Sequence, residues 1–192
     1  MPINDLTLGY AFCGSFCTIK KSIEKLRELK SIGCNVIPIM SENACSMNTR
    51  FGNACDIIWE IEDICGKKII KNISEAEPIG PKKMMDVLVI CPCTGNTLAK
   101  LSNAITDTCV TMAAKSHLRI GRPVLITLAS NDGLGASANN IGKLINTKNI
   151  FFTPFSQDDF VNKPNSLVAN FDLLIPSIEA AYNKTQLQPV II

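Results

Sequence analysis

The stretch of sequence that decides the fold covers residues 86–97 and reads DVLVICPCTGNT. Its first half contains the continuous apolar run Val-Leu-Val-Ile, which is typical of a strand buried on both faces of a parallel sheet. Its second half is small and polar, and Leu98, Leu101 and Ile105 follow at helical spacing. The stretch therefore predicts a central strand, a polar turn and a helix.

The same alternation continues outward along the chain in both directions. Strands are predicted at residues 6–12, 36–40, 86–91, 124–129 and 150–155, with a further short one at 69–70. Amphipathic helices are predicted between them, including one at 107–118, and a last helix at 172–183. No linker or low-complexity tract interrupts the pattern. We therefore predict an α/β fold with a doubly wound, mostly parallel sheet of about six strands, residues 1–192 forming one domain.

Composition and charge exclude several classes of protein. Of the 192 residues, 46% are hydrophobic and 19% are charged, and the formal net charge of +2 is not gathered into blocks, so no nucleic-acid surface is expected. No apolar run approaches the roughly 18 to 20 residues that span a bilayer, and the first residues do not resemble a signal peptide, which predicts a cytoplasmic protein without membrane contact. Nine cysteines and one histidine provide only one C-x-C, so we expect reduced thiols and no metal site.

Small polar residues follow four of the predicted strands. In a doubly wound sheet the ligand lies beyond the carboxyl ends of the strands, where small residues let backbone N–H groups approach an anion. The residues expected to bind a cofactor are Gly14, Ser15, Phe16, Ser41, Cys93, Thr94, Asn96, Thr97, Ser130 and Asn131.

The absence of two nucleotide-binding motifs indicates which nucleotide cofactor to expect. Neither G-x-G-x-x-G nor the Walker pattern is present, so a mononucleotide such as FMN is favoured over NAD or ATP. The alternative for each single loop is that its small polar residues only cap helices.

Several motifs carry a family resemblance. Residues 92–100, PCTGNTLAK, followed by Asn103, Ala104, Ile105 and Asp107, resemble the P-x-(S/T)-A-N-T-x-x-K…N-G-I-x-D signature of the homo-oligomeric flavin-containing cysteine decarboxylases and the flavin prenyltransferases. Within that superfamily, residues 48–52, 76–81, 130–135 and 148–159 resemble the family of dipicolinate synthase B subunits.

The resemblance implies a flavodoxin-like or Rossmann-like three-layer sandwich that binds FMN and forms a homo-oligomer, a trimer or a multiple of one. It further implies conversion of dihydrodipicolinate to dipicolinate (pyridine-2,6-dicarboxylate) in the mother cell during spore formation, together with the A subunit of dipicolinate synthase, which carries NAD(P). Two alternatives are a flavin prenyltransferase or flavin-dependent decarboxylase acting on another acid, and a non-catalytic subunit that binds substrate or stabilises its partner.

Departures from the flavoenzyme relatives leave the catalytic residues unassigned. The decarboxylases use a histidine upstream of the central strand and a cysteine in a late flap, whereas this chain has no histidine between Asp56 and Asp86 and no cysteine after Cys109. The turn that is P-A-M-N in those enzymes keeps only Asn131. The sole histidine, His117, is interpreted as an exposed residue or a helix cap. These differences argue against cysteine-peptide decarboxylation.

A dicarboxylate substrate requires cationic partners, preferably arginine. Arg50 is the one arginine on a loop after a predicted strand end, so Arg50 and Asn131 are the predicted substrate-binding residues, a solvated surface arginine being the alternative.

The remaining candidates have simpler interpretations. Cys93 is interpreted as a small packed thiol rather than a nucleophile, and Asp158 and Asp159 as loop acids rather than an acid/base pair. Met112, Ala113 and Ala114 suit close helix contacts, either between protomers or within the core.

Overall fold

Strand β3 (Val87–Cys93) lies in the middle of the sheet, and all seven of its residues are buried. In the computed structural model, which describes residues 2–192, five parallel strands follow the order β2-β1-β3-β4-β5. Two short antiparallel strands, β7 and β6, continue from the last residues of β4. The other strands are β1 (Thr7–Phe12), β2 (Asn35–Met40), β4 (Val124–Ser130), β5 (Ile150–Phe152), β6 (Phe155–Gln157) and β7 (Leu167–Ala169).

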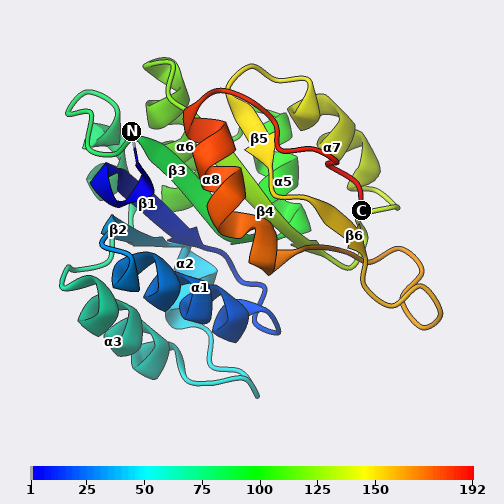
Figure 1. Ribbon diagram of the computed structural model, residues 1–192. Helices are drawn as coiled ribbons and strands as arrows, with labels where there is room; N and C mark the ends of the chain where they lie inside the picture. The colour runs from blue at the N-terminus through cyan, green and yellow to red at the C-terminus, as the bar shows by residue number, and fades with distance from the viewer. Residues whose placement is uncertain (1) are drawn as a thin grey trace.

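Helices cover both faces of the sheet (Figure 1). One face carries α1 (Ile19–Ser31), α3 (Ala54–Cys65) and α8 (Leu174–Tyr182), and the other carries α5 (Gly95–Ser102), α6 (Cys109–Arg119) and α7 (Ala138–Ile145). The connections contain the short helices α2 (Glu42–Ser46) and α4 (Ile73–Ala76) and the 3₁₀ turns Ile3–Asp5, Glu77–Ile79 and Phe171–Leu173.

Side chains of β3 alternate between the two apolar cores, which is the pattern of a strand covered on both sides. Val87, Val89 and Cys91 belong to the core under α1, and Leu88 and Ile90 to the core under α6. The predicted three-layer α/β sandwich with a doubly wound, mostly parallel sheet is confirmed. The predicted ends of most long strands and helices lie within two residues of the observed ones. The exception is α5, which ends at Ser102, three residues before the expected Ile105, because Ala104 adopts a left-handed backbone conformation (φ 56°).

The predicted last strand at 150–155 is two strands. β5 ends at Phe152, Thr153 still donates its N–H to Ile126 (3.0 Å), and Pro154 then interrupts the ladder because it has no N–H. Phe155 begins β6, which pairs with β7, so the sheet has seven strands instead of about six. The short strand expected at 69–70 is a single bridge between Ile39 and Ile70.

His117 is buried, contrary to its interpretation as an exposed or capping residue. Val110, Ala113, Ala114 and His117 recur at helical spacing along the buried face of α6, so the ring is directed into the protein. Ala113 and Ala114 are fully buried in the same way, which assigns them to the core of the chain itself.

Within residues 2–192, no helix combines the length and the apolar character required to cross a membrane.

Candidate functional site

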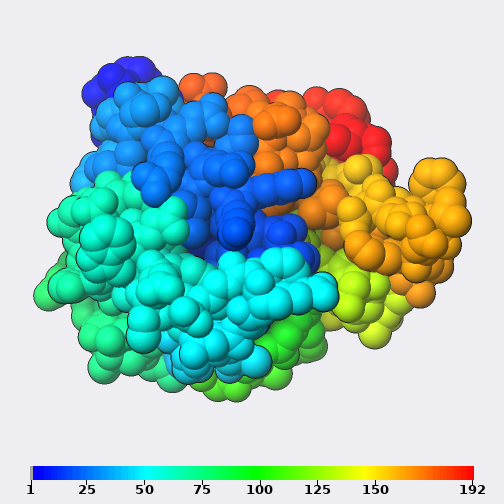
Figure 2. Space-filling view, turned by 90° about the horizontal axis from the view of Figure 1, so that it is seen from below, coloured from blue at the N-terminus to red at the C-terminus, as the bar shows by residue number. Residues whose placement is uncertain are grey.

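The carboxyl ends of β1, β3 and β4 open into a cavity of about 1150 Å³. It lies where the strand order reverses between β1 and β3, the position at which doubly wound sheets bind ligands. Figure 2 views the molecule from below, with the blue segment after β1 between a cyan loop and the yellow-orange loop between β6 and β7. Because pockets for small molecules and cofactors measure about 300–1,000 Å³, the cavity has room for a mononucleotide.

The turn from β1 to α1 forms one wall of the cavity with Gly14, Ser15, Phe16, Cys17 and Thr18. Ser15 donates its N–H to the carbonyl of Cys13 (2.8 Å), and the Thr18 hydroxyl donates to Ser15 Oγ (2.9 Å). Lys21, one turn into α1, places a cation on the same wall. Hydroxyl groups, a helix N-terminus and a lysine together suit a phosphate group.

The turn from β3 to α5 forms the floor with Thr94, Gly95 and Asn96. Thr94 Oγ1 caps the helix by accepting the Thr97 N–H (3.2 Å). The first N–H groups of a helix have no partner within the helix, so those of Gly95 and Asn96 are available to a ligand. The Asn96 side chain is exposed toward the cavity opening.

The end of β4 forms the opposite wall with Ala129, Ser130, Asn131 and Asp132. Ser130 and Ser137 donate their hydroxyl hydrogens to the Asp132 carboxylate, which lowers the pKa of Asp132. This wall therefore contains an ionised carboxylate beside the amide of Asn131.

Two surface loops complete the rim. The loop between β6 and β7 contributes Asp158 and Lys163, whose charged groups are 2.9 Å apart, and this ion pair raises the pKa of Lys163. The loop between α2 and α3 contributes Arg50 and Phe51, and the Arg50 guanidinium lies 4.9 Å from the centre of the Phe51 ring. Arg50 is exposed, so its guanidinium is free to contact a bound anion.

The structure brings together most of the predicted residues but not all of them. Those that line the cavity are Gly14, Ser15, Phe16, Arg50, Thr94, Asn96, Ser130 and Asn131. Ser41, Cys93 and Thr97 do not line it. Cys93 is buried in the core, where burial raises its thiol pKa, and the buried Thr97 hydroxyl donates to Cys13 Sγ (3.3 Å).

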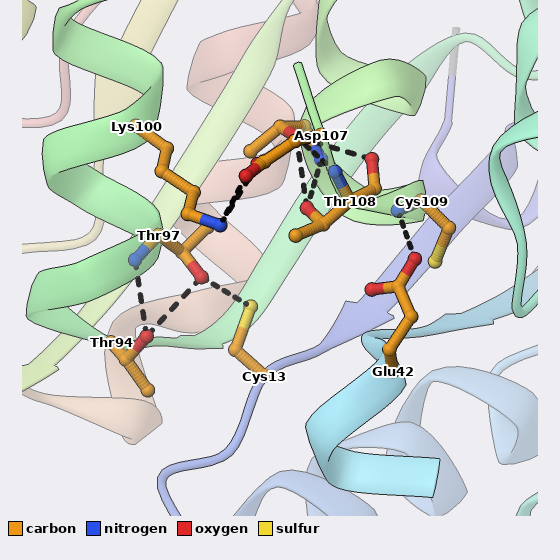
Figure 3. A network of polar contacts seen from close by, with 9 residues as sticks. Cys13, Glu42, Thr94, Thr97, Lys100, Asp107, Thr108 and Cys109 are labelled. Carbon is orange, nitrogen blue, oxygen red and sulfur yellow. Dashed lines mark hydrogen bonds and ion pairs between the residues drawn. The ribbon is translucent and has the colours of Figure 1, made fainter. Parts of the chain in front are cut away.

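Ser41 lies outside the cavity because the turn after β2 serves a different helix. Its hydroxyl accepts the Ala44 N–H at the start of α2 (3.4 Å). The adjacent Glu42 carboxylate accepts the Cys109 N–H at the start of α6 (2.8 Å; Figure 3). The N-terminus of α6 thus already has an anionic partner from the chain itself.

The same view explains part of the sequence signature. Lys100 of α5 reaches across to Asp107, just before α6, with an N–O distance of 2.8 Å (Figure 3). These two residues occupy the K and D positions of the signature and join the first two helices after β3. They support the floor of the cavity from outside it.

The predicted binding residues do not include Lys21, Gly95, Asp132, Asn140 or Lys163, which also line the cavity, although Gly95 and Asp132 lie in turns that the sequence places at strand ends. Lys21 follows the β1 turn by one helical turn, and Asp132 directly follows Asn131, so both had a positional signal. Lys163 had none, because it reaches the cavity only through the pairing of β6 with β7.

The cysteines form no metal site within residues 2–192, where no group of three ligand-type residues is close enough to hold an ion. All nine thiols are free, and burial raises the pKa of Cys13 and Cys45 to about 11. The buried thiols are therefore protonated at neutral pH.

Comparisons with known proteins agree on one family. The family model described as Flavoprotein matches residues 3–170. The chain is 45% identical over 185 residues to the B subunit of dipicolinate synthase from Bacillus subtilis (strain 168), which covers 96% of this chain and 92% of that protein. The crystal structure of the dipicolinate synthase B subunit from Bacillus halodurans C superposes with a TM-score of 0.91 at 40% identity, covering 100% of this chain and 98% of the other.

A more distant structure shares the fold. It is that of DmrB from Burkholderia xenovorans in complex with FMN, with a TM-score of 0.69 and 18% identity over 93% of this chain and 96% of the other.

Proposed function

The chain belongs to the flavoprotein family, and from that premise we propose that it binds FMN in the cavity and acts with a second subunit to oxidise dihydrodipicolinate to dipicolinate. The observation that carries this proposal is the 45% identity to a dipicolinate synthase B subunit over nearly the whole chain. We further propose that the partner is the A subunit of dipicolinate synthase, which carries NAD(P), and that the setting is the mother-cell cytoplasm during spore formation.

The residues of the cavity fit FMN. Gly14 and Gly95 keep two turns free of side chains, Ser15 and Thr18 offer hydroxyls, and Lys21 supplies a cation for the phosphate. FMN, when bound, supplies a two-electron acceptor. The volume of about 1150 Å³ leaves room for a small acid beside it.

The chain's own residues would bind and orient the substrate. Arg50 suits a carboxylate because a guanidinium presents two parallel N–H donors. Asn131, on the wall across the floor, offers an amide donor for the same acid.

The test is to measure dipicolinate formation by the purified chain with and without the A subunit, with NADP or oxygen as acceptor. Bound flavin and activity that requires this chain are the expected results. A colourless protein that only stabilises the A subunit would support the non-catalytic alternative, and flavin binding with activity on another acid would support a different enzyme of the family.

A further inference from the structure

The two carboxylates that line the cavity differ in their partners. Asp158 is exposed and forms an ion pair with Lys163. Asp132 Oδ1 instead accepts two hydrogen bonds from the hydroxyls of Ser130 and Ser137 (2.9 Å for Ser137), both of which are buried. Asp132 Oδ2 hydrogen-bonds to no other residue among 2–192. The carboxylate is thus held by one oxygen, and the other is left for a ligand.

Contacts of its side chain and of its backbone fix the position of the Asp132 carboxylate. A Cβ added to Gly95 would lie 2.8 Å from Asp132 Oδ1 and 2.7 Å from Ser130 Oγ, so the group packs directly against the first residue of α5. The Asp132 carbonyl accepts the N–H groups of Gly135 (2.8 Å) and Ser137 (3.3 Å). Neither the backbone nor the side chain can turn away without losing these contacts.

Its surroundings keep Asp132 ionised. Two hydroxyl donors stabilise the charged form and lower the pKa of the group, and the N-terminus of α5 favours a negative charge beside it. An ionised carboxylate with one free oxygen attracts N–H and O–H groups and repels phosphates and carboxylates.

We propose that Asp132 determines which part of the ligand meets this wall: its Oδ2 accepts a hydrogen bond from an N–H or O–H group of bound flavin, and its charge keeps anionic groups away from the start of α5. This inference rests on the proposed binding of FMN. It places the phosphate toward Gly14–Thr18 and Lys21, on the wall across the cavity from Asp132.

Asp132→Asn tests the acceptor role with little change in shape. Ser130 and Ser137 would continue to donate to the amide oxygen, so the amide nitrogen would take the place of Oδ2 and present a donor where an acceptor stood. Hydrogen bonds to charged groups are worth about 1.5–3 kcal/mol, so FMN and riboflavin, which lacks the phosphate, should each bind about tenfold to a hundredfold more weakly.

The measurements are titrations of FMN and riboflavin by fluorescence quenching and displacement of FMN by inorganic phosphate. In Asp132→Asn, the inhibition constant of phosphate, obtained after correction for the weaker FMN binding of the variant, should be lower than in the wild type, because a repelling charge is gone. A misfolded variant would bind FMN, riboflavin and phosphate all more weakly. Weaker binding of the two flavins together with tighter binding of phosphate therefore distinguishes the proposed role from loss of structure. Asp172→Asn, which removes an exposed carboxylate outside the cavity, is the control for the lost charge and should bind like the wild type.

A second variant, Ser137→Ala, tests the same role if Asp132→Asn does not fold. Ser137→Ala keeps the carboxylate but removes one of its two donors, and it should weaken FMN binding by less than Asp132→Asn. Equal FMN binding by the wild type and Asp132→Asn, or weaker phosphate binding by the variant, would overturn the inference alone. A wild-type protein that does not bind FMN would overturn both the inference and the proposed function.

Discussion

Replacing His117 should remove a large part of the acid sensitivity of the fold. The ring is fully buried on the inner face of α6, and neither ring nitrogen makes a hydrogen bond of good geometry within the described part of the chain. Backbone groups of Pro123 and Asp86 approach the ring and only partly offset the effect of burial on its pKa. Burial, together with the nearby Arg122 guanidinium, lowers the pKa of His117 from 6.5 to about 4. Arg122 is itself held by Asp86, 3.2 Å away, so the charged groups around the ring are already paired.

The sign of the effect follows from the direction of the shift. Between pH 6.5 and about 4 the unfolded chain binds a proton at His117 that the folded chain does not, so the free energy of unfolding falls as the pH falls through this window. A difference of about 2.5 pKa units corresponds to about 3 kcal/mol at 1.36 kcal/mol per unit. The contribution levels off above about pH 7.5, where the ring is unprotonated in both states.

The assay is urea unfolding of the wild type and His117→Leu at intervals from pH 8 to pH 4.5. Leucine is apolar and does not titrate, so acids common to both proteins cancel in the difference between the two curves. We expect the wild type to lose about 2 to 3 kcal/mol more than the variant over this range. Parallel curves would show that the ring titrates alike in the folded and unfolded states, as a ring exposed to water does, and would refute the reasoning.

Three further predictions concern the cavity and the assembly. Asn96→Ala should lose bound flavin, measured as absorbance after gel filtration, whereas Asn146→Ala on the surface should retain it; equal flavin in both variants would remove Asn96 from the cofactor site. Arg50→Lys should lower kcat/KM for dihydrodipicolinate by about tenfold, and Arg50→Ala by more, because the bidentate donor pair is lost. Arg27→Lys, outside the cavity, is the control. An unchanged kcat/KM in both Arg50 variants would exclude Arg50 from the substrate site. Sedimentation at micromolar concentration should give a multiple of the 20.9 kDa chain, and a monomer would contradict the expected homo-oligomer.

Elements with a strong local pattern were predictable from the sequence. The buried run of β3 and the spacing of apolar residues in α1 and α3 each specify one element and its buried face. β6 and β7 were not predictable because three residues show no period, and their pairing depends on a contact between distant segments. The burial of His117 was missed because its residue type was given more weight than its position on the inner face of α6.

In the candidate site, too, residues with a local sequence signal were predictable, whereas those brought in by contacts between distant segments were not. Residues at the ends of β1, β3 and β4 were predictable because the carboxyl ends of parallel strands share one edge. The position of the strand ends does not predict which helix N-termini are free to bind a ligand. Side chains from other elements decide this. Lys163 reaches the rim through the β6–β7 pairing, and no local motif marks it.

The N-termini of α5 and α6 show how side chains from other elements decide where a ligand can bind. α5 begins with Gly95, and the side chains of Ser130, Asp132 and Ser137 occupy the space that a Cβ at Gly95 would need, while the Asn96 side chain stays exposed. α6 begins with Cys109, whose N–H is taken by the Glu42 carboxylate at 2.8 Å. An anionic ligand would have to displace that carboxylate to bind at α6, whereas at the β1 turn it meets hydroxyls and Lys21, and the Asp158 carboxylate of the β6–β7 loop is already paired with Lys163. The site therefore spans the ends of three strands, and the end of β2 serves to stabilise a helix.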